Sequence, residues 1–496
     1  MIKKLEIIFI LFVLYATVAN AQNINPTDDQ VYIEREIMVI RMTMSAEDKA
    51  FLLHEDNKYS EVYVPADVTI SNSQLDEEVL NVGVRLRGNS SRGHLKKAFK
   101  IDFKEFGGGK FHGYKKFNLK PDVNDPTLIR ELLTMHLYRL MEVPAQRVTP
   151  VQLFMNEEYM GAYLNLEQID DEFVDSRFGH EDGFLYKCAW GATLQDNGQV
   201  FNTNLFESKI NEDTDTRAEL EQFVKILNNT SDKDFVEEIE KVFSVDRYLR
   251  QMAVEALTGH WDGYSYNQNN FYLFYNEQTG LVEFLPYDTD NTWGISWGSR
   301  DWATRNLGSF YRAGNPRPLS SRILDVEAYK DTYFDYLRFL FENYFNEEYL
   351  YPIFDHYEAL LDELIQADTY YSLGFGFSYE DFKSSYDFGK IDHVKYGLRG
   401  FLKTRTEYGL EDLPTILGVE DSGYALFPNP SDENRFYLQA STADLEVEVY
   451  TIDGRKLATE VNRAGSKKME VSIRGGIQPG IYLIKIDQQL VKWVKK

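Results

Sequence analysis

The stretch that says most about the fold is residues 260–294, HWDGYSYNQNNFYLFYNEQTGLVEFLPYDTDNTWG. Two apolar segments within it, Asn270–Tyr275 and Val282–Pro286, flank the turn residues Gln278-Thr279-Gly280, a pattern typical of a β-hairpin. A polar loop precedes this hairpin, and Asp288-Thr289-Asp290-Asn291 follows it. Because the two strands of a hairpin begin and end near each other, we expect the polar loop and the acidic segment to adjoin.

The polar residues of this stretch suit phosphate chemistry. Hard cations such as Mg²⁺ take oxygen ligands from Asp and Asn side chains, while a second Asp can accept the proton of an attacking hydroxyl. Asp262, an asparagine of residues 263–270 and Asp288 are therefore candidates for one phosphoryl-transfer site. A structural calcium loop at residues 288–291, or a turn rich in Asp and Asn that binds nothing, are the alternatives that this segment leaves open.

The rest of the body divides into a strand-rich and a helix-rich part. Alternating and β-branched segments predict strands at residues 31–42, 61–70, 82–87, 98–103, 151–155 and 159–166. Helical periodicity predicts helices at residues 126–141 (capped by Asp125), 216–227, 232–243, 245–257, 329–345, 347–367 and 392–408. The expected fold class is α+β, with a two-lobed body whose sheet-rich lobe ends at about residue 168.

The composition changes near residue 417. Beyond it the sequence predicts short strands at residues 436–439, 445–452, 469–473 and 480–486, with Asp453-Gly454 as a hairpin turn. We expect residues 418–496 to form a small all-β sandwich. These residues are electrically neutral, because residues 419–496 contain 11 acidic and 11 basic side chains.

The N-terminus has the features of a signal peptide. Two lysines, an apolar run from residue 7 to about residue 19 and Ala19-Asn20-Ala21 follow the order of charged, apolar and cleavage regions. A membrane anchor is the alternative, but the run is shorter than the roughly 20 residues of a spanning helix. We expect removal of residues 1–21, no membrane span in the mature chain from Gln22, and export through the periplasm to the cell surface or medium.

The composition excludes several classes of protein. Of the 496 residues 79 are acidic and 53 basic, and the net charge of −26 argues against nucleic-acid binding. The hydrophobic fraction of 43% excludes global disorder. Cys188 is the only cysteine, so an intramolecular disulfide and a multi-cysteine zinc site are both impossible. Because the whole charge excess falls on the body, we expect a basic or Ser-rich protein partner.

A local basic cluster contrasts with this acidic background and comprises Arg85, Arg87, Lys96, Lys97 and Lys100. It surrounds the turn Gly88-Asn89-Ser90-Ser91, where side chains and backbone N–H groups together can bind phosphate. The alternative is a solvated strand edge, on which lysines prevent association with other sheets. Glu131 can pair with one of these lysines or interact favourably with the N-terminus of its helix.

Residues 31–413 resemble the CotH kinase family, the spore-coat protein H group of atypical protein kinases. The likeness rests on separate motifs in one order, VGVRLRGNSS (82–91), KAFKI (97–101), IREL (129–132), YLNLEQ (163–168), WDGY (261–264) and LPYDTD (285–290). The resemblance implies a kinase-like fold that transfers phosphate from ATP to protein hydroxyls with Mg²⁺ or Mn²⁺. Asp262 would be the catalytic residue and Asp288 a metal ligand. Further metal ligands stay open among Asn267, Asn270 and Asp290.

The same resemblance suggests how ATP is bound. Lys97 or Lys100 would bind phosphate, with Glu131 as the helix partner of that lysine, and Glu167 would lie beside the nucleotide hinge. A kinase-type Gly-rich loop is absent from the sequence. The resemblance therefore assigns part of that role to Arg87, Asn89 and Ser90.

The tail resembles a type A sorting domain of the type IX secretion system of Bacteroidetes, through FPNP (427–430), YTIDGR (450–455), PGIYL (479–483) and a basic end. This implies passage across the outer membrane by that machinery, and a carbohydrate-binding sandwich is the alternative. The combined expectation is a secreted atypical protein kinase acting on Ser or Thr of an extracytoplasmic protein. A catalytically inactive surface or adhesion module that kept the fold is the alternative, because ATP is scarce outside the cytoplasm.

Overall fold

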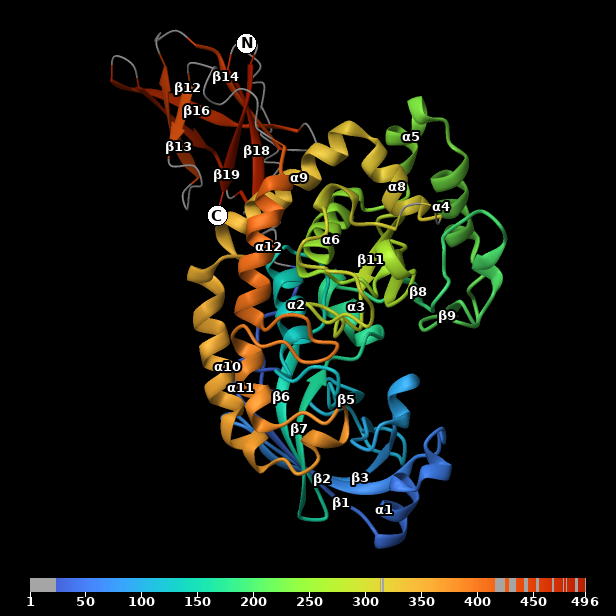
Figure 1. Cartoon of the computed structure of the whole chain (residues 1–496). Coiled ribbons are helices and arrows are strands. Elements are labelled where there is room, and N and C mark those ends of the chain that lie inside the picture. The colour runs from blue at the N-terminus through green and yellow to red at the C-terminus, as the bar shows by residue number, and fades with distance from the viewer. Residues whose placement is uncertain are drawn as a thin grey trace, which may run out of the picture. The chain divides into compact units, whose positions relative to one another are not determined.

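The fold is taken from a computed structural model (Figure 1). The structure describes residues 24–414 except 313 and 315, and 424–427, 434–440, 445–451, 455–465, 468–475, 477–478, 480–486 and 489–495. The expected signal peptide, residues 1–21, lies outside the described residues. The chain separates into two compact units, one formed by Ile24–Thr415 and one that contains Ile416–Lys496, and each is described by itself.

The N-terminal part of the first unit is a closed seven-stranded barrel (Figure 1). Around the barrel the strands are β1 (Met38–Thr43), β2 (Val64–Ser71), β3 (Asp76–Leu86), β4 (Phe99–Asp102), β5 (Lys116–Lys120), β7 (Glu158–Leu166) and β6 (Val148–Met155). The barrel is closed by the parallel pair β1 and β6, while the other neighbours are antiparallel.

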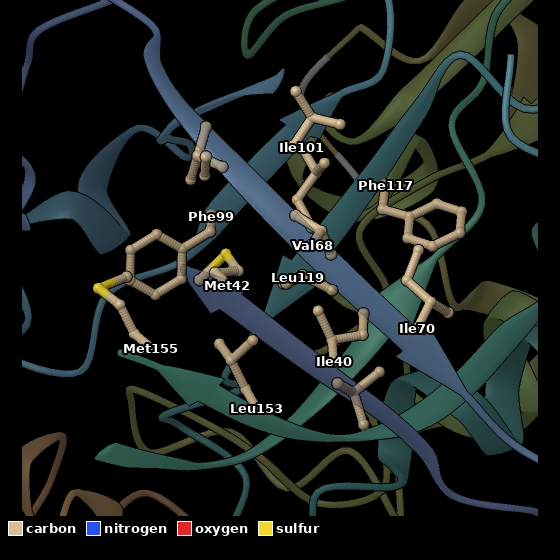
Figure 2. Close-up of a cluster of buried hydrophobic side chains, with 14 of the residues drawn as sticks. Ile40, Met42, Val68, Ile70, Phe99, Ile101, Phe117, Leu119, Leu153 and Met155 are labelled. Atoms are coloured by element: carbon tan, nitrogen blue, oxygen red, sulfur yellow. The ribbon is translucent and has the colours of Figure 1, made fainter. Parts of the chain in front are cut away.

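Alternate residues of these strands fill the barrel. Figure 2 shows the side chains that gather there, among them Ile40, Met42, Val68, Ile70, Phe99, Ile101, Phe117, Leu119, Leu153 and Met155, all of them buried. Since successive side chains of a strand point to opposite faces, the residues between them lie on the outer face of the barrel. Lys100 of β4 and Lys120 of β5 are therefore on that outer face.

Helices and a second sheet make up the rest of this unit (Figure 1). The sheet has the order β11 (Leu281–Pro286), β10 (Phe271–Asn276), β8 (Gly183–Cys188) and β9 (Phe206–Ser208). The helices are α1 (Ala46–Leu53), α2 (Arg130–Leu140), α3 (Asp171–Phe178), α4 (Ala218–Asn229), α5 (Asp232–Ile239), α6 (Val245–Thr258), α7 (Tyr264–Asn267), α8 (Pro318–Asp325), α9 (Glu327–Asn343), α10 (Glu347–Ala367), α11 (Tyr379–Tyr386) and α12 (Leu398–Asp412).

The expected α+β class and the order of strands before helices are confirmed. Helix α10 has the limits that the sequence predicts. Helix α2 begins at Arg130 rather than at residue 126, because the Asp125 carboxylate accepts the backbone N–H groups of Thr127 and Arg130 and holds the intervening residues in a turn. The sequence prediction missed β5, β8 and β9.

The second unit is built from two antiparallel sheets among its described residues. Their orders are β12 (Tyr424–Phe427), β13 (Arg435–Ala440), β17 (Lys468–Ile473), β16 (Thr459–Gly465), and β15 (Lys456–Leu457), β14 (Val447–Thr451), β18 (Gly480–Ile486), β19 (Gln489–Lys495). Phe436, Val471, Ile484 and Trp493 belong to one buried core. The expected small all-β domain is confirmed. Within the described part of the chain, no helix is long and apolar enough to cross a membrane.

Candidate active site

The hairpin of β10 and β11 brings the polar loop and the acidic segment together, as the sequence predicts. The strands pair from Phe271 opposite Pro286 to Asn276 opposite Leu281. Beyond the pair of Phe271 and Pro286, at the open end of the hairpin, the Asn270 side-chain Nδ2 donates to the backbone oxygen of Asp288 at 3.4 Å. Asn270 and Asp288 both adopt left-handed backbone, with φ of 55° and 51°, which Asn and Asp tolerate better than most residues.

Three asparagines hold the carboxylate of Asp262. Asn267 and Asn269 donate to Oδ1, and Asn270 donates to Oδ2 at 3.0 Å. Burial raises the pKa of Asp262 above its ordinary value; the Asn267 amide opposes this shift, and the neighbouring Asp288 charge adds to it. The structure thus joins Asp262 to Asp288 through Asn270.

The loop that carries Asp262 is anchored to helix α6. Glu255, fully buried in α6, accepts hydrogen bonds from Ser265 N at 3.1 Å and Ser265 Oγ at 2.9 Å. Gly263 allows this close approach, because a Cβ atom there would lie 2.5 Å from Glu255 Oε1. His260, at the start of the loop, is neutral since burial lowers its pKa to about 4.

A lysine that the sequence prediction did not include lies at the centre of the acidic residues. The ammonium of Lys120, on β5, lies 2.7 Å from Glu131 of α2, 2.6 Å from Asp288, 3.1 Å from Asp290 and 3.2 Å from Asp122. We call these five residues the Lys120 cluster. They connect the outer face of the barrel to helix α2 and to the segment that follows β11.

The Lys120 cluster holds more carboxyl groups than one ammonium can neutralise. Burial alone would lower the pKa of Lys120, but the surrounding carboxylates raise it well above its ordinary value, so the lysine is an ammonium ion. Burial raises the pKa of Asp290 to about 8, aided by the charges of Asp288 and Glu131 against the attraction of Lys120. One ammonium cannot keep four carboxyl groups ionised, so burial and mutual repulsion raise the pKa of Asp122 and Glu131 as well. Burial would raise the pKa of Asp288 too, but Lys120 lowers it, and the Asp288 side chain keeps 37% of its surface exposed. Oxygen donors that hold protons for lack of positive charge, at a site open to solvent, suit a hard divalent cation that can replace those protons.

The prediction that Glu131 pairs with a lysine of the basic cluster is wrong, because its partner is Lys120. Lys97 Nζ donates to the backbone oxygen of Arg92 at 2.9 Å and lies 3.5 Å from Glu55. It lines a cavity of about 270 Å³ on the barrel, whose lining includes none of the Lys120 cluster. Lys97 lies just before β4, and its ammonium is held by the backbone of Arg92 and by Glu55 rather than by the acidic segment.

Lys100 lies on the outer barrel face among other basic groups. Its Nζ donates to Gln168 Oε1 at 3.1 Å. Burial lowers the pKa of Lys100 to about 7, and the positive charges of Arg87, Arg85, Lys116 and Lys187 act in the same direction. A buried lysine among cations is a site where an anion such as a phosphate would be stabilised.

The turn after β3 reaches the acidic segment through Arg87. Its guanidinium donates to Tyr287 Oη at 3.4 Å, next to Asp288 in the chain. Asn89 is exposed, and the side chain of Ser90 lies outside the described part of the structure. The binding roles of Asn89 and Ser90 therefore stay predictions.

Glu167 is enclosed in a buried ion network, which we call the Glu167 cluster. Its carboxylate lies 2.6 Å from Arg147 and 2.5 Å from Arg177, and Arg147 also pairs with Asp29 at 2.8 Å. Burial alone would raise the pKa of Glu167, but the two guanidinium groups hold it at about 2. With its side chain 3% exposed, the carboxylate of Glu167 is committed to these arginines, and only the backbone around it can border a nucleotide.

Lys120, Asp122 and Lys187 were not among the sequence candidates, and Asn269 was included only as one of the asparagines of residues 263–270. The signal for Lys120 is the alternation in Lys116-Phe117-Asn118-Leu119-Lys120, which predicts a short strand with its lysines on one face. Lys187 follows the similar apolar run Phe184-Leu185-Tyr186. Neither pattern indicates that Lys120 meets carboxylates or that the ammonium of Lys187 lies 4.9 Å from the centre of the Tyr287 ring.

Lys120 of the barrel and Glu131 of helix α2 thus meet Asp288 after the hairpin. Asn270 connects Asp288 to Asp262, which precedes the hairpin. The chain matches the family described as CotH kinase protein over residues 84–408, well over half of its length. It therefore belongs to the CotH kinase family, a family of protein kinases, and membership implies the use of ATP. Residues 425–496 match the secretion system C-terminal sorting domain, which marks the chain as a secreted or surface protein that uses secretion machinery.

Several named proteins are similar to this chain. Inner spore coat protein H of Bacillus subtilis is 27% identical over 296 residues, which cover 58% of this chain and 77% of that protein. Spore coat protein homolog 1 of Rhizopus delemar is 30% identical over 252 residues, covering 48% and 40%. Invasin CotH7 of the same fungus is 28% identical over 242 residues, covering 46% and 40%. The matched region thus spans about two fifths of these two fungal proteins.

Proposed function

We propose that this protein is a secreted atypical protein kinase with a two-lobed, kinase-like body that transfers the γ-phosphate of ATP to Ser or Thr hydroxyls of an extracytoplasmic protein. One observation carries the proposal. Asn270 bridges Asp262 to Asp288, and Asp288 pairs with the lysine that Glu131 holds. The base, the oxygen ligands and the phosphate-binding cation that phosphoryl transfer needs are thereby brought together.

Asp262 is the proposed catalytic base. It accepts the proton of the Ser or Thr hydroxyl while the hydroxyl oxygen attacks the γ-phosphorus. The bond from that phosphorus to the bridging oxygen breaks, and ADP leaves with the electron pair. The three asparagine amides keep the carboxylate in one orientation, and its raised pKa makes it a stronger base than an ordinary aspartate.

The residues present also fit ATP with Mg²⁺ or Mn²⁺. Asp288 and Asn270 would hold the ion through oxygen atoms, with Asn267 and Asp290 as further candidate ligands. A divalent ion supplies positive charge that neutralises the phosphates. On the barrel side, Lys120 is fixed by Glu131, and the basic groups that surround Lys100 add positive potential for the phosphates.

The sorting domain indicates where the kinase acts. We infer that the type IX machinery carries the protein across the outer membrane, so that its protein acceptor lies outside the cytoplasm. This places the requirement for ATP outside the cytoplasm as well. A catalytically inactive surface module is the competing function, and transfer of labelled phosphate separates the two.

The test uses the mature chain with γ-labelled ATP, Mg²⁺ and a Ser-rich acceptor. Asp262→Asn should lower the labelling rate by about 10²–10⁴-fold, the usual contribution of a positioned base. Asp182→Asn changes an aspartate whose side chain is 60% exposed and should label like the wild type. Equal labelling by wild type and Asp262→Asn, or none by the wild type with any acceptor tried, would exclude kinase activity at this site.

A further inference from the structure

Three arginines gather around the ring of Tyr266, beside the Asp262 loop. The guanidinium carbons of Arg300, Arg305 and Arg312 lie 5.4, 5.2 and 5.7 Å from the centre of that ring. Attraction between cations and the aromatic face favours each contact separately. Three like charges around one ring nevertheless repel one another, so the arrangement gains most when an anion joins it.

Few acidic groups oppose this arginine cluster. Within the described part of the chain, Arg300 and Arg312 pair with no carboxylate, and both side chains are exposed. Arg305 uses its N–H groups on backbone oxygens of residues 309–311. Asp301, the adjacent acid, accepts hydrogen bonds from Tyr396 Oη at 2.6 Å and from Ala303 N at 2.9 Å. The cluster therefore has N–H donors left for a ligand.

The arginine cluster is attached directly to the loop that carries Asp262. Tyr266 belongs to helix α7, whose last residue, Asn267, donates to the Asp262 carboxylate. Trp302, which lies between Arg300 and Arg305 in the chain, packs its ring 4.7 Å from that of Tyr266 and 6.1 Å from that of Trp261. The segment with the arginines is thus packed against both ends of the loop.

These arginines lie apart in the chain from the basic groups that meet the acidic segment. Arg87 contacts Tyr287, and Lys120 contacts Asp288, so the phosphates of ATP already have cations in the proposed site. The arginine cluster belongs instead to residues 300–312, after the acidic segment. It is available to the other substrate, the acceptor.

We propose that Arg300, Arg305 and Arg312 form a subsite for a carboxylate or phosphate group on the acceptor polypeptide, close to the hydroxyl that receives phosphate. This inference rests on the proposed function and names its substrate class. Guanidinium groups bind carboxylate and phosphate with paired N–H donors, and phosphate carries the larger charge. For this part of the surface, the proposal replaces the basic acceptor that was expected from the net charge of −26 with an acidic or phosphorylated one.

The test measures binding without catalysis. Fluorescent peptides carry Ala in place of the acceptor Ser, flanked by Glu, phosphoserine, Gln or Lys, and binding to the full mature chain is followed by anisotropy at low salt without nucleotide. The Glu and phosphoserine peptides should bind roughly tenfold more tightly than the Gln and Lys peptides, with phosphoserine ahead. The double change Arg300→Gln and Arg312→Gln alters exposed side chains only and should remove the difference.

The matched control is Arg41→Gln. Arg41 also lies over an aromatic ring, 3.9 Å from the centre of Phe154, and its side chain is 41% exposed on the barrel. This variant should bind like the wild type. Tightest binding of the Lys peptide, or equal binding of anionic peptides by wild type and the double variant, would overturn the subsite.

Peptide binding, measured beside phosphate transfer to the Ser-rich acceptor, distinguishes this inference from the kinase assignment. Asp262→Asn should bind the anionic peptides like the wild type, while its transfer of labelled phosphate to the Ser-rich acceptor falls by about 10²–10⁴-fold. If the wild type transfers no phosphate but still binds them through these arginines, the anion site stands and the kinase assignment fails.

Discussion

The Glu167 cluster and the Lys120 cluster are both buried networks of charge, and they differ in how complete they are. In the first, the carboxylates of Glu167 and Asp29 balance two guanidinium groups. In the second, a single ammonium meets four carboxyl groups, of which Asp122 and Asp290 have raised pKa values, and the cluster opens to solvent at Asp288. A network that is balanced within the chain is costly to break, because removing one partner leaves a buried charge without compensation. One that lacks the positive charge to ionise all its acids is suited to a cation.

The largest expected loss of stability comes from removing the carboxylate at the centre of the Glu167 cluster. Glu167→Gln leaves Arg147 and Arg177 buried without their shared carboxylate, so the free energy of unfolding should fall by about 3–5 kcal/mol. Denaturant unfolding measures this loss. Glu157→Gln is the control, because the Glu157 side chain is 82% exposed and should change stability by less than about 0.5 kcal/mol. Similar small losses in both variants would show that the Glu167 cluster contributes little.

Acid should undo the same cluster in the wild type. The folded pKa of Glu167 is about 2 and its ordinary value is 4.5. The depressed pKa contributes stability that is fully present above pH 4.5 and is lost as the pH falls towards 2. The shift corresponds to about 3 kcal/mol. The stability difference between wild type and Glu167→Gln should therefore narrow by that amount over this range, and a constant difference would mean that the carboxylate does not titrate there.

Much of the candidate site could be predicted from the sequence, but the lysine at its centre could not. The hairpin at residues 271–286 has strong apolar segments and a turn, so the meeting of Asp262 with Asp288 was predictable. Lys120 stands on a five-residue strand with two inward apolar residues, a weak periodic signal. Its partner Asp288 is 168 residues away, and which lysine of several reaches it depends on how the barrel closes.

Glu167 is the opposite case, because the sequence drew attention to this residue but did not reveal the role of its side chain. Its motif indicated a functional position, yet its carboxylate meets Arg147 and Arg177, whose positions in the chain give no sign of a shared partner. The sequence identifies which residues are charged. Whether a buried charge is balanced is decided by tertiary contacts, and that balance separates the structural glutamate from the candidate site.

Adding a divalent cation should stabilise the open cluster by a smaller amount. Mg²⁺ at a hundred times its dissociation constant should add about 2.7 kcal/mol to the free energy of unfolding, and Asp288→Asn should remove most of that gain. Asp171→Asn is the control. Asp170, Asp171 and Glu172 are close enough to share a cation, but Lys115 pairs with two of them. The opposite result would contradict the proposed site. If Asp171→Asn removes the stabilisation by Mg²⁺ and Asp288→Asn keeps it, the cation binds beside Asp171 and not in the Lys120 cluster.

The smallest expected effect concerns Lys100, which is surrounded by positive charges. Its pKa of about 7 means that it is mostly charged at pH 6 and mostly neutral at pH 8. If the phosphates of ATP bind beside the ammonium form, affinity for ATP should fall by roughly tenfold between these values. Lys100→Arg keeps its charge throughout and should show a flatter profile at similar affinity. The phosphates of ATP titrate equally in the experiments with both proteins. The difference between the two calorimetric affinity profiles therefore reports the titration of Lys100 alone. Identical pH profiles would show that Lys100 does not sense the phosphates.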